Sequence, residues 1–170
     1  MQFLISALAV CATLWATSSF ADTVEDRARA FAENCFSPYL TARKAKRVLG
    51  GSGARYDFYD LDPFSNVAPS PAFGVRPATP GTDRRCEVSF DGVHTDVAVN
   101  FALSAVKREG LFDEEPVPDA IQRLPSTNLL AARRLNPRKI AVIHIGTRAG
   151  PNTTETFMTL ERLPNRSGTD

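Results

Sequence analysis

The first third of the chain carries apolar residues at helical spacing and predicts two helices. The first is predicted over residues 23–36. Its apolar stripe consists of Val24, Ala28, Phe31 and Cys35. The second is predicted to begin at Ser37-Pro38, because the first helical turn does not need the N–H that proline lacks, and to end at Gly50-Gly51. Its apolar face consists of Tyr39, Ala42, Ala45 and Leu49.

The middle of the chain is patterned as a strand followed by a long loop. Residues 55–64, "RYDFYDLDPF", alternate aromatic and acidic side chains and predict a short strand. Residues 63–84 are predicted to form a loop, because prolines exclude an interior strand or helix. The part Pro63–Pro80 is predicted to be flexible, since few apolar side chains are present to anchor it. Its prolines are Pro63, Pro69, Pro71, Pro77 and Pro80.

A strand and a helix are predicted next, over residues 84–92 and 95–109. The strand alternates, with Cys86, Val88 and Phe90 on one side and Glu87 and Ser89 on the other. Asp91-Gly92 indicates a turn, Thr95 is predicted to cap the helix, and Gly110 is predicted to end it.

The last third predicts a β-meander. Residues 111–126 are acidic and proline-containing and are predicted to be a loop. Strands are predicted over residues 129–135, 139–147 and 156–163, with a turn at Asn136-Pro137, and residues 164–170 are predicted to be a flexible tail. N-terminal helices, a strand-helix unit and a C-terminal antiparallel meander in one small sheet give an α+β fold.

Residues 1–21 have the composition of a secretory signal peptide. An uncharged apolar run from Phe3 to Ala16 precedes Ser19 and Ala21, two small residues at the positions that a signal peptidase recognises. Cleavage is therefore predicted between Ala21 and Asp22, which leaves a single domain over 22–163. An uncleaved membrane anchor is the alternative, although the run is short for a spanning helix, and no later segment is apolar enough to span a membrane.

The formal net charge of +1 favours neither nucleic acid nor an anionic membrane as a general partner. Charge is nevertheless uneven along the chain, with a basic run in the predicted second helix and a second basic group formed by Arg133-Arg134 with Arg138-Lys139. The basic run, whose members are Arg43, Lys44, Lys46 and Arg47, is a candidate partner surface. A merely solvated helix face is the other interpretation.

The acidic cluster Asp57, Asp60 and Asp62 raises the hypothesis of a calcium site. An EF-hand loop needs a glycine at its sixth position and a glutamate at its twelfth, and the sequence has neither. An exposed strand edge kept soluble by charge explains the same residues more simply.

Removal of the leader takes away Cys11 and leaves Cys35 and Cys86. An even number of cysteines in an exported protein favours a disulfide between them. A reactive thiol and a metal ligand are the alternatives, but neither cysteine has a second cysteine or a histidine at the spacing of a metal motif. No metal site and no cofactor are predicted.

The two histidines are the remaining candidates for chemistry. His144 lies in the apolar strand "KIAVIHIGT", where a lone histidine is more often structural, whereas His94 lies just before a helix. Motifs of nucleophile-elbow hydrolases, phosphate loops, dinucleotide folds and zinc proteases are absent from the sequence. No catalytic residue is therefore predicted.

The segment "ENCFSPYL", together with "RRCEVSF" and the helix that follows it, resembles small exported proteins of alphaproteobacteria that have no assigned function. The resemblance covers most of the chain after the leader. It implies a periplasmic α+β domain with a disulfide and no catalytic residues.

These observations predict a periplasmic or secreted binding or accessory module without catalytic activity. Its partner would be an anionic envelope component or a periplasmic protein, contacted through the basic helix and the Pro63–Pro80 loop. Attachment to an envelope surface through that helix and a hydrolase of unrecognised type are the alternatives.

Overall fold

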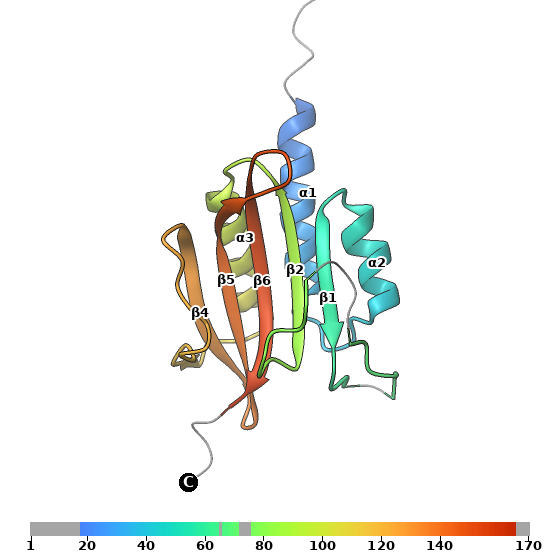
Figure 1. The fold of residues 1–170 in the computed structure, drawn as a ribbon, viewed down its shortest axis with the longest axis vertical. Coiled ribbons are helices and arrows are strands. Elements are labelled where there is room, and N and C mark those ends of the chain that lie inside the picture. Colours follow the sequence, from blue (N-terminus) through green and yellow to red (C-terminus); the bar gives the residue numbers. More distant parts are fainter. Residues whose placement is uncertain (1–17, 65, 72–75, 166–170) are drawn as a thin grey trace, which may run out of the picture.

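The chain folds around one antiparallel sheet with helices on one of its faces (Figure 1). The structure is a computed structural model that describes residues 18–64, 66–71 and 76–165. The sheet has six strands in the order β1-β2-β6-β5-β4-β3. The predicted α+β class is therefore confirmed, including the C-terminal meander and its union with the Cys86 strand in one sheet.

The strands agree closely with the alternating patterns of the sequence. The longest pairing joins the last two strands, from Lys139 opposite Pro164 to Ala149 opposite Thr154. The strands are β1 (Arg55–Asp60), β2 (Arg84–Asp91), β3 (Glu114–Glu115), β4 (Thr127–Asn136), β5 (Lys139–Ala149) and β6 (Thr154–Pro164). Two predictions need correction. The segment 111–126 contains β3, because Glu114 and Glu115 pair with β4, and the end of the chain stays in the sheet as far as Pro164.

The three described helices are α1 (Ser18–Asn34), α2 (Ala42–Gly51) and α3 (Thr95–Arg108). The start of α2 differs from the prediction at Pro38, because the Thr41 side chain accepts a hydrogen bond from the Lys44 N–H and caps the helix there. The cap of α3 also differs, since His94 and not Thr95 occupies the N-cap position. Each helix nevertheless lies where the periodicity placed it.

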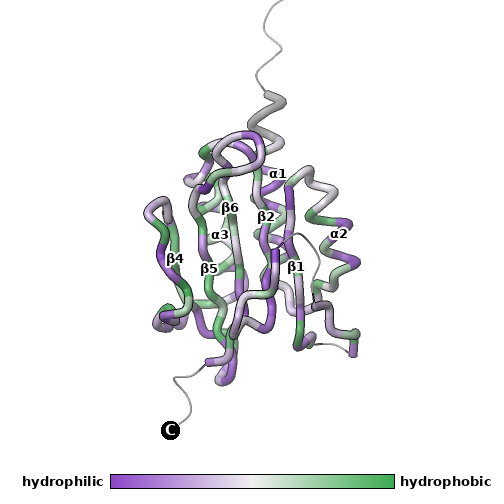
Figure 2. The backbone as a smooth tube through the Cα atoms, viewed as in Figure 1, coloured by the Kyte–Doolittle hydropathy of each residue, from purple (hydrophilic) through white to green (hydrophobic). Residues whose placement is uncertain are grey.

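The main core lies between α1, α3 and the inner face of the sheet, which we define as the face that carries Cys86, Val88 and Phe90. Alternate residues of the central strands point into it, and Phe31 on α1 is fully buried against them. In Figure 2, β5 is largely hydrophobic, whereas α2 alternates between hydrophobic and hydrophilic turns. This contrast fits a strand buried in the sheet and a helix with one exposed side.

The described part of the 63–84 segment is held at several points. Ser70 and Asp60 exchange two backbone hydrogen bonds, of 2.9 and 2.7 Å, and the Thr79 N–H donates to the hydroxyl of Tyr59 at 3.0 Å. These polar contacts are anchors that the apolar pattern of the segment did not predict. Residues 72–75 lie outside the described part, so the predicted flexibility of the whole loop stays a prediction.

The N-terminal predictions fall largely outside the described residues. Residues 1–17 of the predicted signal peptide are not described, and α1 begins at Ser18, ahead of the predicted cleavage point between Ala21 and Asp22. Among the described helices, none combines the length and apolar character needed to cross a membrane. The tail residues 166–170 are likewise outside the description.

Candidate functional site

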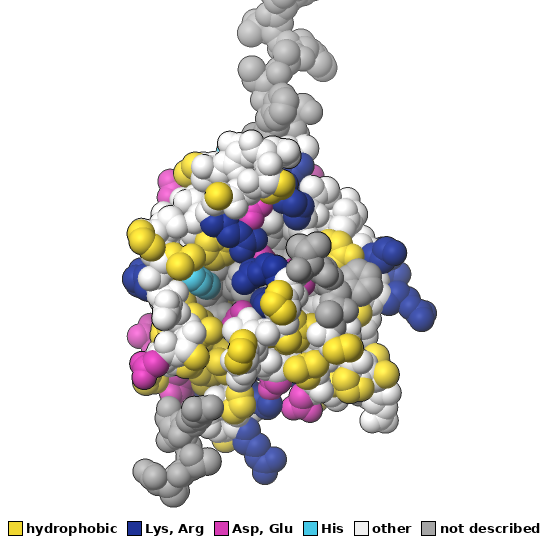
Figure 3. Space-filling model, viewed as in Figure 1, with side chains coloured by type: hydrophobic (Ala, Val, Ile, Leu, Met, Phe, Trp, Pro, Cys, Tyr) yellow, Lys and Arg dark blue, Asp and Glu magenta, His cyan; other side chains and the backbone are white. Residues whose placement is uncertain are grey.

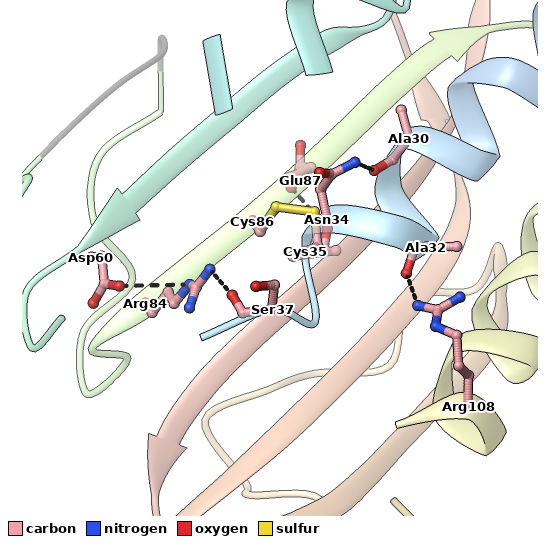
Figure 4. The surroundings of a disulfide bond; sticks show 11 residues. Ala30, Ala32, Asn34, Cys35, Ser37, Asp60, Arg84, Cys86, Glu87 and Arg108 are labelled. Carbon is pink, nitrogen blue, oxygen red and sulfur yellow. Dashed lines mark hydrogen bonds and ion pairs between the residues drawn. A yellow bond between two sulfur atoms is a disulfide. The ribbon is translucent and has the colours of Figure 1, made fainter. Parts of the chain in front are cut away.

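The predicted disulfide between Cys35 and Cys86 is present and buried (Figure 4). It joins the residue that follows α1 to the second helix-facing residue of β2, across a Cα–Cα distance of 5.4 Å. Because both sulfurs are bonded and both residues are almost fully buried, neither cysteine is a nucleophile or a metal ligand in this state. The pair therefore connects the helix layer to the sheet.

The basic run lies on α2 as an unpaired cationic face. Arg43, Lys46 and Arg47 are exposed and Lys44 is half-buried. None of the four makes an ion pair within the described part of the chain, although most other described lysines and arginines do. In Figure 3, basic side chains project from the edge of the molecule that α2 occupies.

The start of α2 and the Pro63–Pro80 loop come together, as the proposed partner surface requires. They line a shared hollow of about 380 Å³, to which Arg43 contributes from the helix and Pro63, Val67 and Ser70 contribute from the loop. Val67 is 45% exposed, so the hollow has an apolar margin beside the cations. We name this hollow and the four cations of α2 the α2 surface.

The second basic group does not extend the α2 surface. Arg133 and Arg134 lie on β4, near the opposite edge of the sheet from β1. They make ion pairs with β3, where Arg133 contacts Glu114 at 2.7 Å and Arg134 contacts Glu115 at 2.5 Å. Of the other two members of this group, Lys139 pairs with Asp62 at 3.2 Å, whereas Arg138 has no carboxylate partner among the described residues. The two basic groups are therefore separate, and the four cations of α2 all lack a carboxylate partner in the described part of the chain.

The acidic cluster is not the charged exposed edge that its sequence suggested. Asp57 and Asp60 are each 4% exposed and lie on opposite faces of β1. Asp57 accepts a hydrogen bond from Arg85 at 2.8 Å, and Asp60 accepts one from Arg162 at 2.9 Å. The two aspartates are thus buried partners of arginines, and no metal-binding group of three or more ligands occurs among the described residues.

The face of the sheet turned away from α1 and α3, which we call the outer face, carries a network of buried charges. Glu87 at its centre is contacted by Arg76, by Arg148 at 2.6 Å and by the Thr159 hydroxyl at 2.8 Å. Burial alone would raise the pKa of Glu87, but its arginine and threonine partners outweigh that effect and lower it. Figure 3 shows basic side chains gathered over the middle of this face.

His144 lies on the outer face in a small cavity of about 190 Å³ that Arg148 and Glu161 also line. Its Nε2 is 2.8 Å from the Thr127 hydroxyl. Its ring packs edge to face on the Phe157 ring, with 5.0 Å between the ring centroids. Burial lowers the pKa of His144, which favours a neutral ring. Glu161 is already occupied, because Thr79 and Thr82 each donate a hydroxyl hydrogen bond to it at 3.0 Å.

His94 lies at the start of α3, away from the cavity of His144. Its backbone N–H donates to the Thr156 hydroxyl at 2.8 Å, and that hydroxyl donates to the Gly92 carbonyl. A side chain at Gly92 would meet the His94 ring, since an ideal Cβ would lie 2.4 Å from its Nε2. These contacts assign His94 a place in the β2–α3 turn.

A second charged group, missed by the sequence analysis, lies at the end of the sheet near the disulfide. Arg84 donates to the Ser37 carbonyl at 2.8 Å, and its Nε is 3.7 Å from Asp60 (Figure 4). Burial lowers the pKa of Arg84 to about 10, which still leaves it charged at neutral pH. One sign of this group is visible in the sequence, because the charged residue Arg84 begins a strand face that is otherwise apolar.

No family model, curated protein or solved structure matches this chain. The resemblance to exported alphaproteobacterial proteins therefore stays a prediction.

Proposed function

We propose that this protein is an exported binding module that acts without catalysing a reaction, in the periplasm or outside the cell. Two observations support the location. The N-terminal residues have the composition of a signal peptide, and the remaining cysteines form a buried disulfide, a bond typical of oxidising compartments.

The observation that carries the binding role is the unpaired charge of α2. Among the described residues most lysines and arginines pair with carboxylates, yet the cations of α2 have no such partner, and the sequence of that helix contains no acidic residue. Several unpaired cations on one short helix attract an anionic partner, and attraction of this kind is screened by salt. We propose an anionic component of the cell envelope as the partner.

A non-catalytic role is supported by the surroundings of the two histidines. His144 is held by Thr127 and Phe157 beside a glutamate that two threonines already engage. His94 belongs to the turn between β2 and α3, where its backbone N–H donates to Thr156 at the start of β6. Structural contacts thus account for the His144 side chain, and the backbone of His94 is fixed in its turn with the ring 6.3 Å from that of Phe90.

The test is chemical cross-linking in envelope fractions of the native host, with the full chain carrying Arg43→Gln and Arg47→Gln. We expect the wild type to capture an envelope partner at low salt and to lose it as salt rises, and the double variant to capture much less. The matched control carries Lys107→Gln and Arg123→Gln, which removes the same charge from two other exposed cations.

Equal capture by wild type and the α2 variant, with the same dependence on salt, would contradict the proposal. Equal losses in the α2 variant and in the control would also contradict it, since overall charge and not α2 would then decide binding.

A further inference from the structure

A third cavity, larger than the two described above, lies at the end of the sheet where β1 ends and β2 begins. It has a volume of about 430 Å³, within the roughly 300–1,000 Å³ of small-molecule sites. Its walls come from the α1–α2 connection, the segment after β1, the β4–β5 hairpin and the ends of β2 and β6. We name it the disulfide cavity, because Cys35 forms part of its lining.

The disulfide cavity is apolar on several sides. Phe36, Leu135 and Leu160 line it together with Pro38 and Pro63. Phe64 is 68% exposed at its margin and packs edge to face on Tyr39, which is 61% exposed. The two rings together form an exposed apolar patch at the margin of the cavity, and a contiguous patch of this kind is typical of a ligand-binding groove. The cavity therefore suits the apolar body of a ligand.

The polar side of the disulfide cavity is cationic. Four cations line it, namely Arg84, Arg138, Lys139 and Arg162. Three carboxylates pair with members of this set, namely Asp60, Asp62 and Asp83. Four cations against three carboxylates leave one positive charge in excess.

One cation of the lining is not engaged by a carboxylate. Arg138 is exposed, and its guanidinium has no carboxylate partner among the described residues. Arg84 is 3% exposed and already engaged, since it donates to the Ser37 carbonyl and its Nε faces Asp60 at 3.7 Å. The positive charge available to a ligand therefore lies at Arg138.

We propose that the disulfide cavity binds an amphipathic monoanion, a carboxylate on an apolar chain. The chain lies against the phenylalanine, leucine and proline walls, and the carboxylate lies at the cationic side, where Arg138 supplies the charge that no carboxylate of the described residues neutralises. This site uses cations other than those of α2, so it stands or falls independently of the α2 surface.

The test is isothermal titration calorimetry of the full chain with three probes that share one alkyl chain: decanoate, decanol and decyltrimethylammonium. We expect decanoate to bind, decanol to bind roughly tenfold more weakly, because a charge-assisted hydrogen bond is lost, and the ammonium not to bind measurably. Equal binding of decanoate and decanol, or no binding of decanoate, would overturn the proposal.

Two variants at exposed positions locate the site without disturbing the core. Arg138→Gln should weaken decanoate by up to roughly fivefold, the range of an exposed charge pair, and should leave decanol unchanged. Phe64→Ala should weaken both probes. The matched controls are Lys107→Gln and Phe112→Ala, since Lys107 is exposed and Phe112 is 69% exposed. Controls that weaken binding as much as the variants would place the probes elsewhere and refute the assignment.

Discussion

Glu87 shows how single residues on the outer face are stabilised. It is 3% exposed, and an isolated carboxylate buried to that extent would be strongly destabilising. Arg76, Arg148 and Thr159 approach it from the loop, β5 and β6. These partners lower its pKa below the ordinary value, so the folded protein holds this proton less tightly than the unfolded chain. Its contribution to stability is therefore present at neutral pH and is lost as the pH falls through about 4.3 and below.

Glu87→Gln should consequently change both the stability and its dependence on pH. At neutral pH we expect the free energy of unfolding to fall by about 1–3 kcal/mol, because two arginines lose their shared carboxylate. Below about pH 4.3 the difference between variant and wild type should shrink, since the wild-type carboxylate is itself becoming protonated. Urea unfolding at a series of pH values measures both effects.

The control for this prediction is Glu25→Gln, which changes an exposed carboxylate 3.9 Å from Arg29. It should alter stability by less than about 0.5 kcal/mol. If the difference in free energy of unfolding between Glu87→Gln and the wild type is the same at every pH, the arginine and threonine partners do not stabilise the charged form of Glu87.

At the scale of elements, the sequence predicted what depends on local periodicity. The alternation of β2 and the apolar β5 identified their strands, and the count of cysteines identified the bond between Cys35 and Cys86. The predicted start of α2 was wrong. Pro38 and Thr41 are both residues that commonly begin a helix, and only the tertiary structure decides between them.

The candidate sites were less predictable, because they depend on residues far apart in the chain. The run on α2 was visible in the sequence as consecutive cations. The burial of Asp57 was not, since its partner Arg85 is 28 residues away and belongs to a neighbouring strand. The disulfide cavity was invisible for the same reason: Phe64, Arg84 and Arg138 meet only when the ends of three strands and a hairpin converge.

Gly146 in β5 controls how closely the chain entering β4 packs against its neighbour. The Thr147 N–H donates to the Ser126 carbonyl at 3.1 Å, and a Cβ on Gly146 would lie 2.5 Å from that same oxygen. It would also lie 3.2 Å from the Phe157 ring. Gly146→Ala should therefore destabilise the protein by about 1–3 kcal/mol, the usual cost of overpacking. Thermal unfolding measures the loss.

The matched control is Gly51→Ala at the end of α2, where a Cβ would meet nothing within 4 Å. It should leave stability unchanged or slightly raised, because alanine restricts the unfolded chain more than glycine does. An equal effect of the two substitutions would show that the close approach at Gly146 is not what limits this position.

For the whole molecule, the disulfide is the covalent connection between its two layers. Cys35 directly follows α1 and Cys86 lies in β2, so the bond closes a loop with a sequence separation of 51 residues. The loop contains α2, β1 and the proline-rich segment, and it thus includes both the α2 surface and one wall of the disulfide cavity. Loss of the bond should therefore disturb both the α2 surface and the disulfide cavity.

The double variant Cys35→Ala/Cys86→Ala should lose about 2–5 kcal/mol of stability, since closing a loop of this length contributes about 4 kcal/mol on the chain-entropy model. Reductant should lower the stability of the wild type toward that of the variant and leave the variant unchanged.

Thiol titration of the unfolded, unreduced wild type tests both the disulfide and the removal of the leader. Protein processed in the native host should begin at Asp22 by mass spectrometry and contain no free thiol, whereas a chain that keeps its leader should contain one, at Cys11. Two additional reactive thiols in processed protein would contradict the disulfide and, with it, the oxidising location on which the proposed function depends.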